Sequence, residues 1–293
     1  MQPTIVAMAP IAALGGAILA SYSSFRKAVL ALLGCSVITA HYSGALTASG
    51  IVTLAILAVV LFMMQKVRGL PGKERGHLIY FIGAIILCAL IVTHVLPGFH
   101  AISFAQDVLL SPQSKTFDIN LGYGKALVAT LLLIYLLNED PIANRWRKIL
   151  PTILVVTTAT TIIIMPLGIL FGIIAYEPKL MPIFFAWALV NLFSAIIIEE
   201  VFFRGILQKK LTNFMTGKIP YSWIWSVLII AWFFALVHMV GGVLYMALVF
   251  IAGCGYGIAY KVAGIEAAIG THLMVNATHF VLFTYPALAT YQP

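Results

Sequence analysis

The chain is poor in charged residues, and acidic side chains are the scarcest of them. Only 9% of its 293 residues are Asp, Glu, Lys or Arg, and nine are Asp or Glu. Hydrophobic residues make up 62%, and the mean hydropathy is +1.06. These values lie far outside the range of soluble globular proteins, so we expect an integral membrane protein.

Cysteine is also scarce, and nothing in the sequence indicates a disulfide framework. Cys35, Cys88 and Cys254 lie in separate apolar stretches without CxxC spacing, so we expect them to pack as small apolar residues. The N-terminus lacks the basic region of a signal peptide, because the first Lys or Arg is Arg26. The first apolar run is therefore expected to be a retained membrane span.

Apolar runs long enough to cross the ~30 Å hydrocarbon core recur from one end of the chain to the other. We predict an all-α polytopic transmembrane helical bundle of about eight to ten spans, formed by residues 1–293 as a single integral-membrane domain. Two of the runs, 28–43 and 124–137, are short enough to be re-entrant or interfacial, which keeps the lower counts open. The candidate spans are 3–21, 28–43, 47–64, 78–95, 124–137, 150–175, 181–203, 221–240, 243–260 and 265–285.

The basic residues fall in alternate connections between these runs, as the positive-inside pattern requires. Ten spans with both termini outside fit this alternation, and the polar connection 96–123 is then an external loop. The net charge of +8 therefore indicates a lipid bilayer, and no nucleic acid, as the partner. We expect a multi-pass protein of the plasma membrane. The basic connections contain Arg26/Lys27, Lys66/Arg68/Lys73/Arg75, Arg145/Arg147/Lys148, Arg204/Lys209/Lys210/Lys218 and Lys261.

Two of the nine acidic residues, Glu199 and Glu200, stand side by side after the apolar run 192–198. A charge in the bilayer core costs at least ~2.5 kcal/mol, so the pair needs an explanation. Glu200 and Arg204 have the i,i+4 spacing at which a guanidinium reaches a carboxylate on a helix, which leaves Glu199 for another role such as general base. The alternative is that both glutamates cap a cytoplasmic helix end beside Arg204.

Three further polar side chains lie in apolar runs closer to the C-terminus. His238 ends an aromatic-rich run, where it is either a packed core histidine or a partner of Glu199 for a water or a metal. His272 and Asn276 share one helix face at i,i+4 spacing, where two donors could stabilise an oxyanion. Interhelical hydrogen bonding is the alternative for this pair.

Three segments carry a family resemblance. EEVFFR (199–204), FALVH (234–238) and HLMVN (272–276) resemble, in the same order, the EExxxR, FxxxH and HxxxN motifs of the CPBP family. This family groups CAAX prenyl endopeptidases with bacterial homologues often labelled Abi or bacteriocin-processing proteins. The resemblance covers residues 190–280, which makes 181–293 the expected catalytic core and 1–180 a set of accessory spans.

The resemblance implies an intramembrane endopeptidase whose active site faces the cytoplasmic side. Glu199 and His238 would activate a water for attack on a peptide carbonyl, and His272 and Asn276 would hold the oxyanion. Glu200 and Arg204 would support the site. The expected substrate is a membrane-anchored, lipidated or amphipathic peptide or protein.

The resemblance does not decide whether a metal takes part, because members of the family have been described both as metalloproteases and as glutamate proteases. An HExxH helix is missing, so Glu199, His238 and His272 would have to supply the ligands of a divalent metal such as zinc from three helices. A carboxylate base with an imidazole partner can also polarise water directly. No cofactor is therefore assigned.

Two other classes of function fit the same residues. A non-catalytic membrane scaffold or immunity protein could keep the motifs as a structural polar network. A transporter is the third class, since charges within the membrane also mark proton and ion pathways.

The depth of His238 conflicts with the predicted topology. Glu199 lies ~28 Å along a span that starts at the outer face, which places it near the cytoplasmic side. His238 lies ~25 Å along a span that starts at the cytoplasmic face, which places it near the outer side. Either that helix begins well outside the membrane at Ile219-Pro220, or it tilts strongly, or the Gly241-Gly242 turn is buried at membrane depth.

Overall fold

A computed structural model describes residues 5–22, 26–67, 70, 72–139 and 146–293. Arg68 and Arg145 of the predicted basic connections lie outside the described residues, as do residues 3–4 of the first predicted span.

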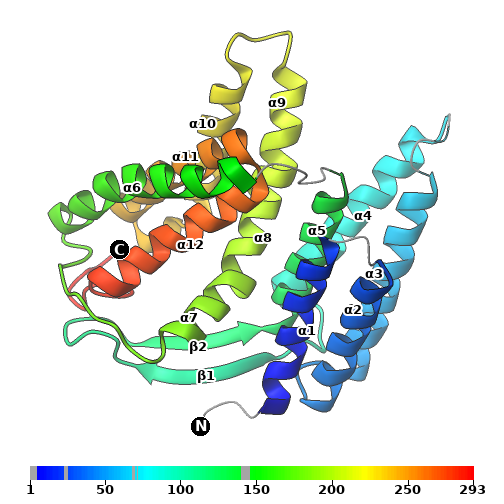
Figure 1. Cartoon of the computed structure of the whole chain (residues 1–293), viewed down its shortest axis with the longest axis horizontal. Coiled ribbons are helices and arrows are strands. Elements are labelled where there is room, and N and C mark those ends of the chain that lie inside the picture. The colour runs from blue at the N-terminus through cyan, green and yellow to red at the C-terminus, as the bar shows by residue number, and fades with distance from the viewer. Residues whose placement is uncertain (1–4, 23–25, 68–69, 71, 140–145) are drawn as a thin grey trace. The chain divides into compact units, whose positions relative to one another are not determined.

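The described residues are mostly helical, and each predicted span corresponds to a helix (Figure 1). The prediction of an all-α bundle is therefore confirmed. Residues 184–215 form one continuous helix that comprises α7, α8 and α9 together with two π-helical segments. The helices are α1 (Ile5–Ser21), α2 (Arg26–Tyr42), α3 (Ala48–Val67), α4 (Glu74–Val92), α5 (Tyr123–Glu139), α6 (Trp146–Leu170), α7 (Phe184–Asn191), α8 (Ile197–Glu200), α9 (Lys209–Met215), α10 (Ser222–Leu236), α11 (Val243–Ala263) and α12 (Ile265–Leu282).

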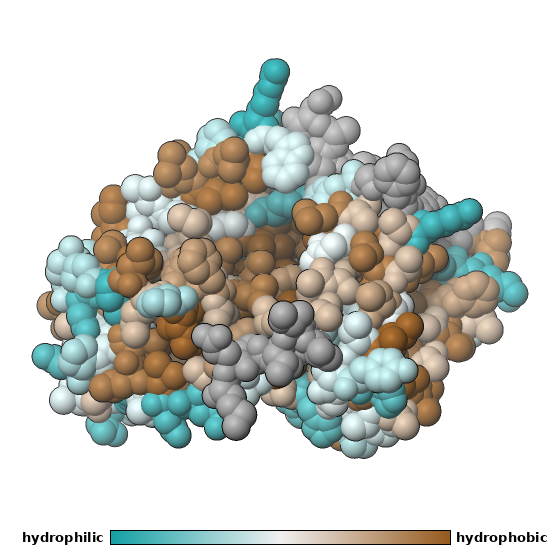
Figure 2. All heavy atoms as spheres, turned by 60° about the horizontal axis from the view of Figure 1, so that its bottom comes forward, coloured by the Kyte–Doolittle hydropathy of each residue, from teal (hydrophilic) through white to brown (hydrophobic). Residues whose placement is uncertain are grey.

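The protein is an integral membrane protein. Five helices within the described ranges are long and apolar enough to cross a membrane, namely α3, α4, α6, the 184–215 helix and α11. Large apolar side chains are exposed along them, for example Leu150, Leu154 and Ile162 on α6. Figure 2 shows hydrophobic atoms as extended patches on one face, with hydrophilic side chains toward its edges. Such patches are expected where lipid is the solvent.

The connection 96–123, predicted as an external loop, contains regular structure. Strands β1 (Ala101–Val108) and β2 (Phe117–Gly122) form a two-stranded sheet. Ile102, Ile119 and Leu121 are buried, while Ala101, Ser103 and Asp118 are exposed. This alternation is the period-2 pattern of a half-buried strand, and it explains why a polar connection here is ordered.

The chain divides into two compact units. One comprises residues 1–104 and 120–134, and the other comprises residues 105–119 and 135–293. The second unit holds all three motif segments together with α6, which precedes residue 181. A functional division at residue 180 stays a prediction.

Within the second unit, α11 packs against α6, α10 and α12. Small residues permit this close approach: the Cα of Gly253 faces Ala231 and Phe234 of α10, and that of Gly255 faces Thr160 of α6. The shared core is apolar and includes Ile230, Phe234, Ala252, Tyr256 and Val275. α11 is thus the central helix against which the motif-bearing helices are placed.

Glu199 and His238 lie at matching distances from one helical hairpin. The 32 residues of the 184–215 helix exceed the ~20 needed to cross a bilayer, and the helix turns back into α10, so that α9 and α10 form a projecting hairpin (Figure 1). Glu199 lies 16 residues before Met215, and His238 lies 16 residues after Ser222. Both are therefore ~24 Å from the hairpin turn, which allows them to lie at the same level. The position of the bilayer along these helices stays a prediction.

Candidate active site

Glu200 and Arg204 form a completely buried ion pair. The Arg204 Nε lies 3.2 Å from Oε2 of Glu200, and both side chains are 0% exposed. The expected i,i+4 partnership is therefore present. The backbone on either side is π-helical, at Leu192–Ile196 and Val201–Gln208. π-helical turns occur frequently at functional sites, where the widened turn changes the direction in which side chains point.

Arg204 also ties its helix to α10 and α11. Its Nη2 donates a hydrogen bond to the carbonyl of Gly253 at 3.1 Å, and its guanidinium lies 4.4 Å from the centre of the Phe234 ring. Because the charge is removed from water, these contacts and the Glu200 carboxylate must offset the cost of its burial. The pair is therefore a structural centre of the second unit.

His272 is the second partner of Glu200. Its Nδ1 lies 2.8 Å from Oε1 of that carboxylate, so it donates this hydrogen bond, and the imidazole is almost fully buried. Tyr256 of α11 stacks on the ring with centroids 4.2 Å apart and planes at 14°. From the sequence, either ring nitrogen of His272 could have donated a hydrogen bond to an oxyanion. In the structure Nδ1 is bonded to Glu200, so only Nε2 remains for an oxyanion.

His238 is held by its own helix. Its Nδ1 lies 2.7 Å from the carbonyl oxygen of Phe234, which can only accept, so Nδ1 carries a hydrogen. In a neutral ring Nε2 then has the free lone pair. The Phe234 ring contacts both imidazoles, at 4.7 Å from His238 and 6.1 Å from His272. One aromatic side chain thus spaces the two histidines.

Glu199 differs from its neighbour in keeping part of its residue surface exposed, whereas Glu200 is completely buried. The Glu199 carboxyl itself is largely removed from water by the surrounding groups. Electrostatic interactions join Glu199 to His272 and His238. The site therefore brings together one partly exposed glutamate and two imidazoles from α8, the α10 end and α12.

Asn276 is positioned by a residue that the sequence analysis did not consider. Its Nδ2 donates a hydrogen bond to Oδ1 of Asn191 at 3.0 Å, across from α12 to α7. Both side chains are partly exposed. Asn191 interrupts the apolar run 183–198 on the same helix as Glu199, and a polar side chain in such a run was the signal that could have found it.

The described residues show no arrangement of ligand side chains that matches the metal-binding hypothesis. Among the described residues, no three His, Cys, Asp or Glu side chains are grouped so that they could hold a metal ion. This includes the three candidates Glu199, His238 and His272.

Comparison with known proteins agrees with the motif resemblance. Residues 181–278 match a family model described as "Type II CAAX prenyl endopeptidase Rce1-like". This segment contains the six predicted site residues. No curated protein and no solved structure gives a match.

Proposed function

We propose that this membrane protein is an intramembrane endopeptidase of the glutamate type, because residues 181–278 match the model of the Rce1-like type II CAAX prenyl endopeptidases. It would hydrolyse a peptide bond in a membrane-associated or lipidated peptide or protein. Glu199 and His238 would activate the water, and His272 and Asn276 would stabilise the oxyanion.

One observation carries this proposal, namely the different environments of the two adjacent glutamates. Glu200 is sealed between Arg204 and His272, where its role is to hold those side chains. Glu199 keeps part of its residue surface exposed, is largely desolvated, and lies in the electrostatic range of both imidazoles. A desolvated carboxylate with imidazole partners at the edge of the core is suited to general-base catalysis.

In the first step, Glu199 takes a proton from a water that also donates a hydrogen bond to the free Nε2 of His238. The resulting hydroxide forms a bond to the peptide carbonyl carbon, and the carbonyl oxygen becomes an oxyanion. The protonated Glu199 then gives its proton to the amide nitrogen as the C–N bond breaks. The products are a new carboxyl end and an amine, with no net change in the enzyme.

The oxyanion would receive hydrogen bonds from Nε2 of His272 and from Asn276. Nε2 donates only when His272 is an imidazolium, because Nδ1–H is already committed to Glu200. Asn276 uses one of its two N–H groups for Asn191, and the other remains for the substrate.

The substrate class follows from the setting of the site. Glu199 lies at the middle of the 184–215 helix, so the scissile bond must enter the membrane region, which favours peptides that carry a lipid or an apolar segment. The positive-inside pattern of the basic connections favours the cytoplasmic side for the hairpin end of the site. A prenylated CAAX peptide is one such substrate, and peptide pheromone or bacteriocin precursors are others of the same chemistry.

The proposal is tested by comparing peptides and membrane proteins from cells that carry the wild type or Glu199→Gln. We expect specific peptides or shortened proteins to appear with the wild type and to disappear with Glu199→Gln, at equal amounts of membrane-inserted protein. Glu74→Gln, which changes an exposed carboxylate in the first unit, is the matched control and should behave as wild type. A cleavage pattern that is identical for wild type and Glu199→Gln would contradict the proposal and favour a scaffold.

A further inference from the structure

Tyr245 is a polar side chain at the candidate active site that has no role in the mechanism so far. It lies in the first turn of α11, shortly after the turn that follows His238, and it is half-buried. The centre of its ring lies 6.5 Å from that of the His238 imidazole, and the side chain interacts electrostatically with Glu199. Its neighbours are therefore the two residues to which the attacking water is assigned.

The face of α11 that carries Tyr245 is directed toward the site. Tyr256 lies 11 residues further along, or about three helical turns, so both rings lie on the same side of the helix. Tyr256 stacks on the His272 imidazole with centroids 4.2 Å apart, and Tyr245 packs against the core cluster to which Tyr256 belongs. α11 thus places one tyrosine beside each of the two histidines.

The ring of Tyr245 is held by the turn before α11. A Cβ on Gly241 would lie 2.3 Å from Cδ1 of this ring, so the ring packs directly on the bare Cα. The N–H of Gly241 donates a hydrogen bond to the carbonyl of His238 at 3.0 Å, and its own carbonyl accepts one from the Tyr291 hydroxyl at 2.7 Å. Tyr245 and His238 are therefore positioned by the same ordered turn.

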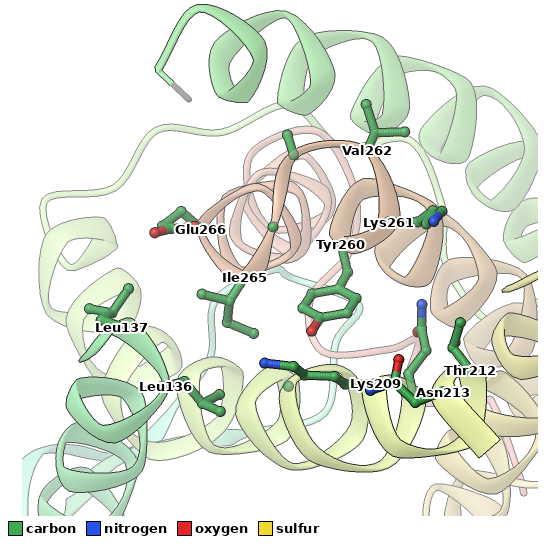
Figure 3. A pocket seen from close by; sticks show the side chains of 14 residues that line it. Leu136, Leu137, Lys209, Thr212, Asn213, Tyr260, Lys261, Val262, Ile265 and Glu266 are labelled. Atoms are coloured by element: carbon green, nitrogen blue, oxygen red, sulfur yellow. The ribbon is translucent and has the colours of Figure 1, made fainter. Parts of the chain in front are cut away.

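The hydroxyl of Tyr245 makes no hydrogen bond to any of the described residues, so its donor remains for a water or a substrate. Tyr260, near the other end of α11, is different. It lines a pocket of about 280 Å³ together with Lys209 and Glu266 (Figure 3), and all three of these residues already have interaction partners. An uncommitted tyrosine hydroxyl is thus found beside the catalytic residues and not in this pocket.

We propose that Tyr245 is a further catalytic residue whose hydroxyl donates a hydrogen bond to the oxygen of the attacking water. This inference rests on the proposed function. The water gives one hydrogen to Glu199 and directs the other to Nε2 of His238, which leaves two lone pairs on its oxygen. One lone pair accepts the hydrogen bond from Tyr245, and the other forms the bond to the peptide carbonyl carbon. The phenol keeps its proton, so it orients the water without changing the products.

The test is the single-turnover cleavage rate and the substrate Kd of the reconstituted full-length protein, on a substrate found by the peptide comparison. Tyr245→Phe should lower the rate about tenfold, because one hydrogen bond to the water is lost. Substrate Kd and unfolding temperature should not change, since the ring keeps its packing on Gly241. The matched control, Tyr221→Phe, removes an exposed hydroxyl from the same unit and should behave as wild type. A normal rate for Tyr245→Phe would overturn the inference, as would a loss confined to Kd.

A double variant shows whether Tyr245 acts on the water that Glu199 deprotonates. In a Glu199→Gln background, adding Tyr245→Phe should slow the remaining cleavage by less than about twofold. Losses that multiply would mean that Tyr245 acts elsewhere and would overturn the inference. Cleavage by Glu199→Gln at the wild-type rate would overturn the proposed function itself. A normal rate for Tyr245→Phe together with an inactive Glu199→Gln would overturn the inference alone.

Discussion

Adjacent glutamates in the same helix have different surroundings. Glu200 points into the core, where Arg204 and His272 hold it, and Glu199 keeps part of its residue surface exposed and interacts electrostatically with His238. The burial of Glu200 is tolerated because its charge is paired, whereas an unpaired charge there would be very costly. In the proposed mechanism, Glu199 reacts and Glu200 only holds its neighbours.

The first prediction concerns the buried pair. Arg204→Met should destabilise the protein by about 3–5 kcal/mol, because it leaves the Glu200 carboxylate buried without its main counter-charge. Thermal unfolding of the purified protein in detergent measures this loss. Adding Glu200→Gln should recover part of it, since the two changes remove both charges. An unchanged unfolding temperature for Arg204→Met would show that the pair does not hold the helices.

The second prediction separates a positioning residue from a catalytic one. Asn191→Ala should lower kcat about tenfold to a hundredfold, because Asn276 loses the acceptor that orients it. Asn276→Ala should lower kcat by about 10²–10³, the usual loss for one oxyanion donor.

The double variant then decides how Asn191 acts. If it works only through Asn276, the double variant is no slower than Asn276→Ala, and KM changes little in all three. A double variant in which the two losses multiply would show that Asn191 contributes separately.

At the scale of helices, the site depends on how closely α11 approaches its neighbours. A Cβ on Gly255 would lie 2.4 Å from Oγ1 of Thr160, far inside contact distance. A Cβ on Gly253 would press on Phe234 and Ala231 of α10. The close approach of these helices also lets the Gly253 carbonyl accept a hydrogen bond from Arg204. The small residues of α11 therefore serve both the close helix packing and the placement of the Arg204 guanidinium.

The third prediction tests this packing. Gly255→Ala should destabilise the protein by about 1–3 kcal/mol through overpacking against α6, although alanine is the better helix former. Gly83→Ala in α4 is the control, because nothing lies within 4 Å of a Cβ added at Gly83. This variant should be as stable as the wild type or more stable. Thermal unfolding compares the two. Equal stability for both variants would contradict the importance of the α6–α11 contact.

The helices themselves could be predicted from the sequence, because long apolar runs in lipid have to be helical. Two features could not. The 184–215 helix was expected to end near residue 203, since Arg204, Lys209 and Lys210 resemble a polar boundary, yet it continues to Met215 because a polar face does not interrupt a helix. The strands β1 and β2 were hidden because their weak alternation lies in a connection rich in polar residues.

At the scale of the whole molecule, the sequence placed five of the six site residues on three spans, with Arg204 just beyond one of them, but could not pair them across the bundle. Spacing along one helix predicted the Glu200–Arg204 contact correctly. The contacts of His272 with Glu200 and of Asn276 with Asn191 join residues 72 and 85 positions apart, which no local pattern encodes. Such contacts depend on how the helices of the second unit pack.

The central claim is that Glu199 removes the proton from the attacking water. Its most direct test is the single-turnover cleavage rate of the purified, reconstituted protein on a substrate found by the peptide comparison, for wild type, Glu199→Gln and Glu74→Gln. We predict a loss of at least about a hundredfold for Glu199→Gln with substrate binding retained, and a normal rate for Glu74→Gln. Cleavage by correctly folded Glu199→Gln at the wild-type rate would contradict the account.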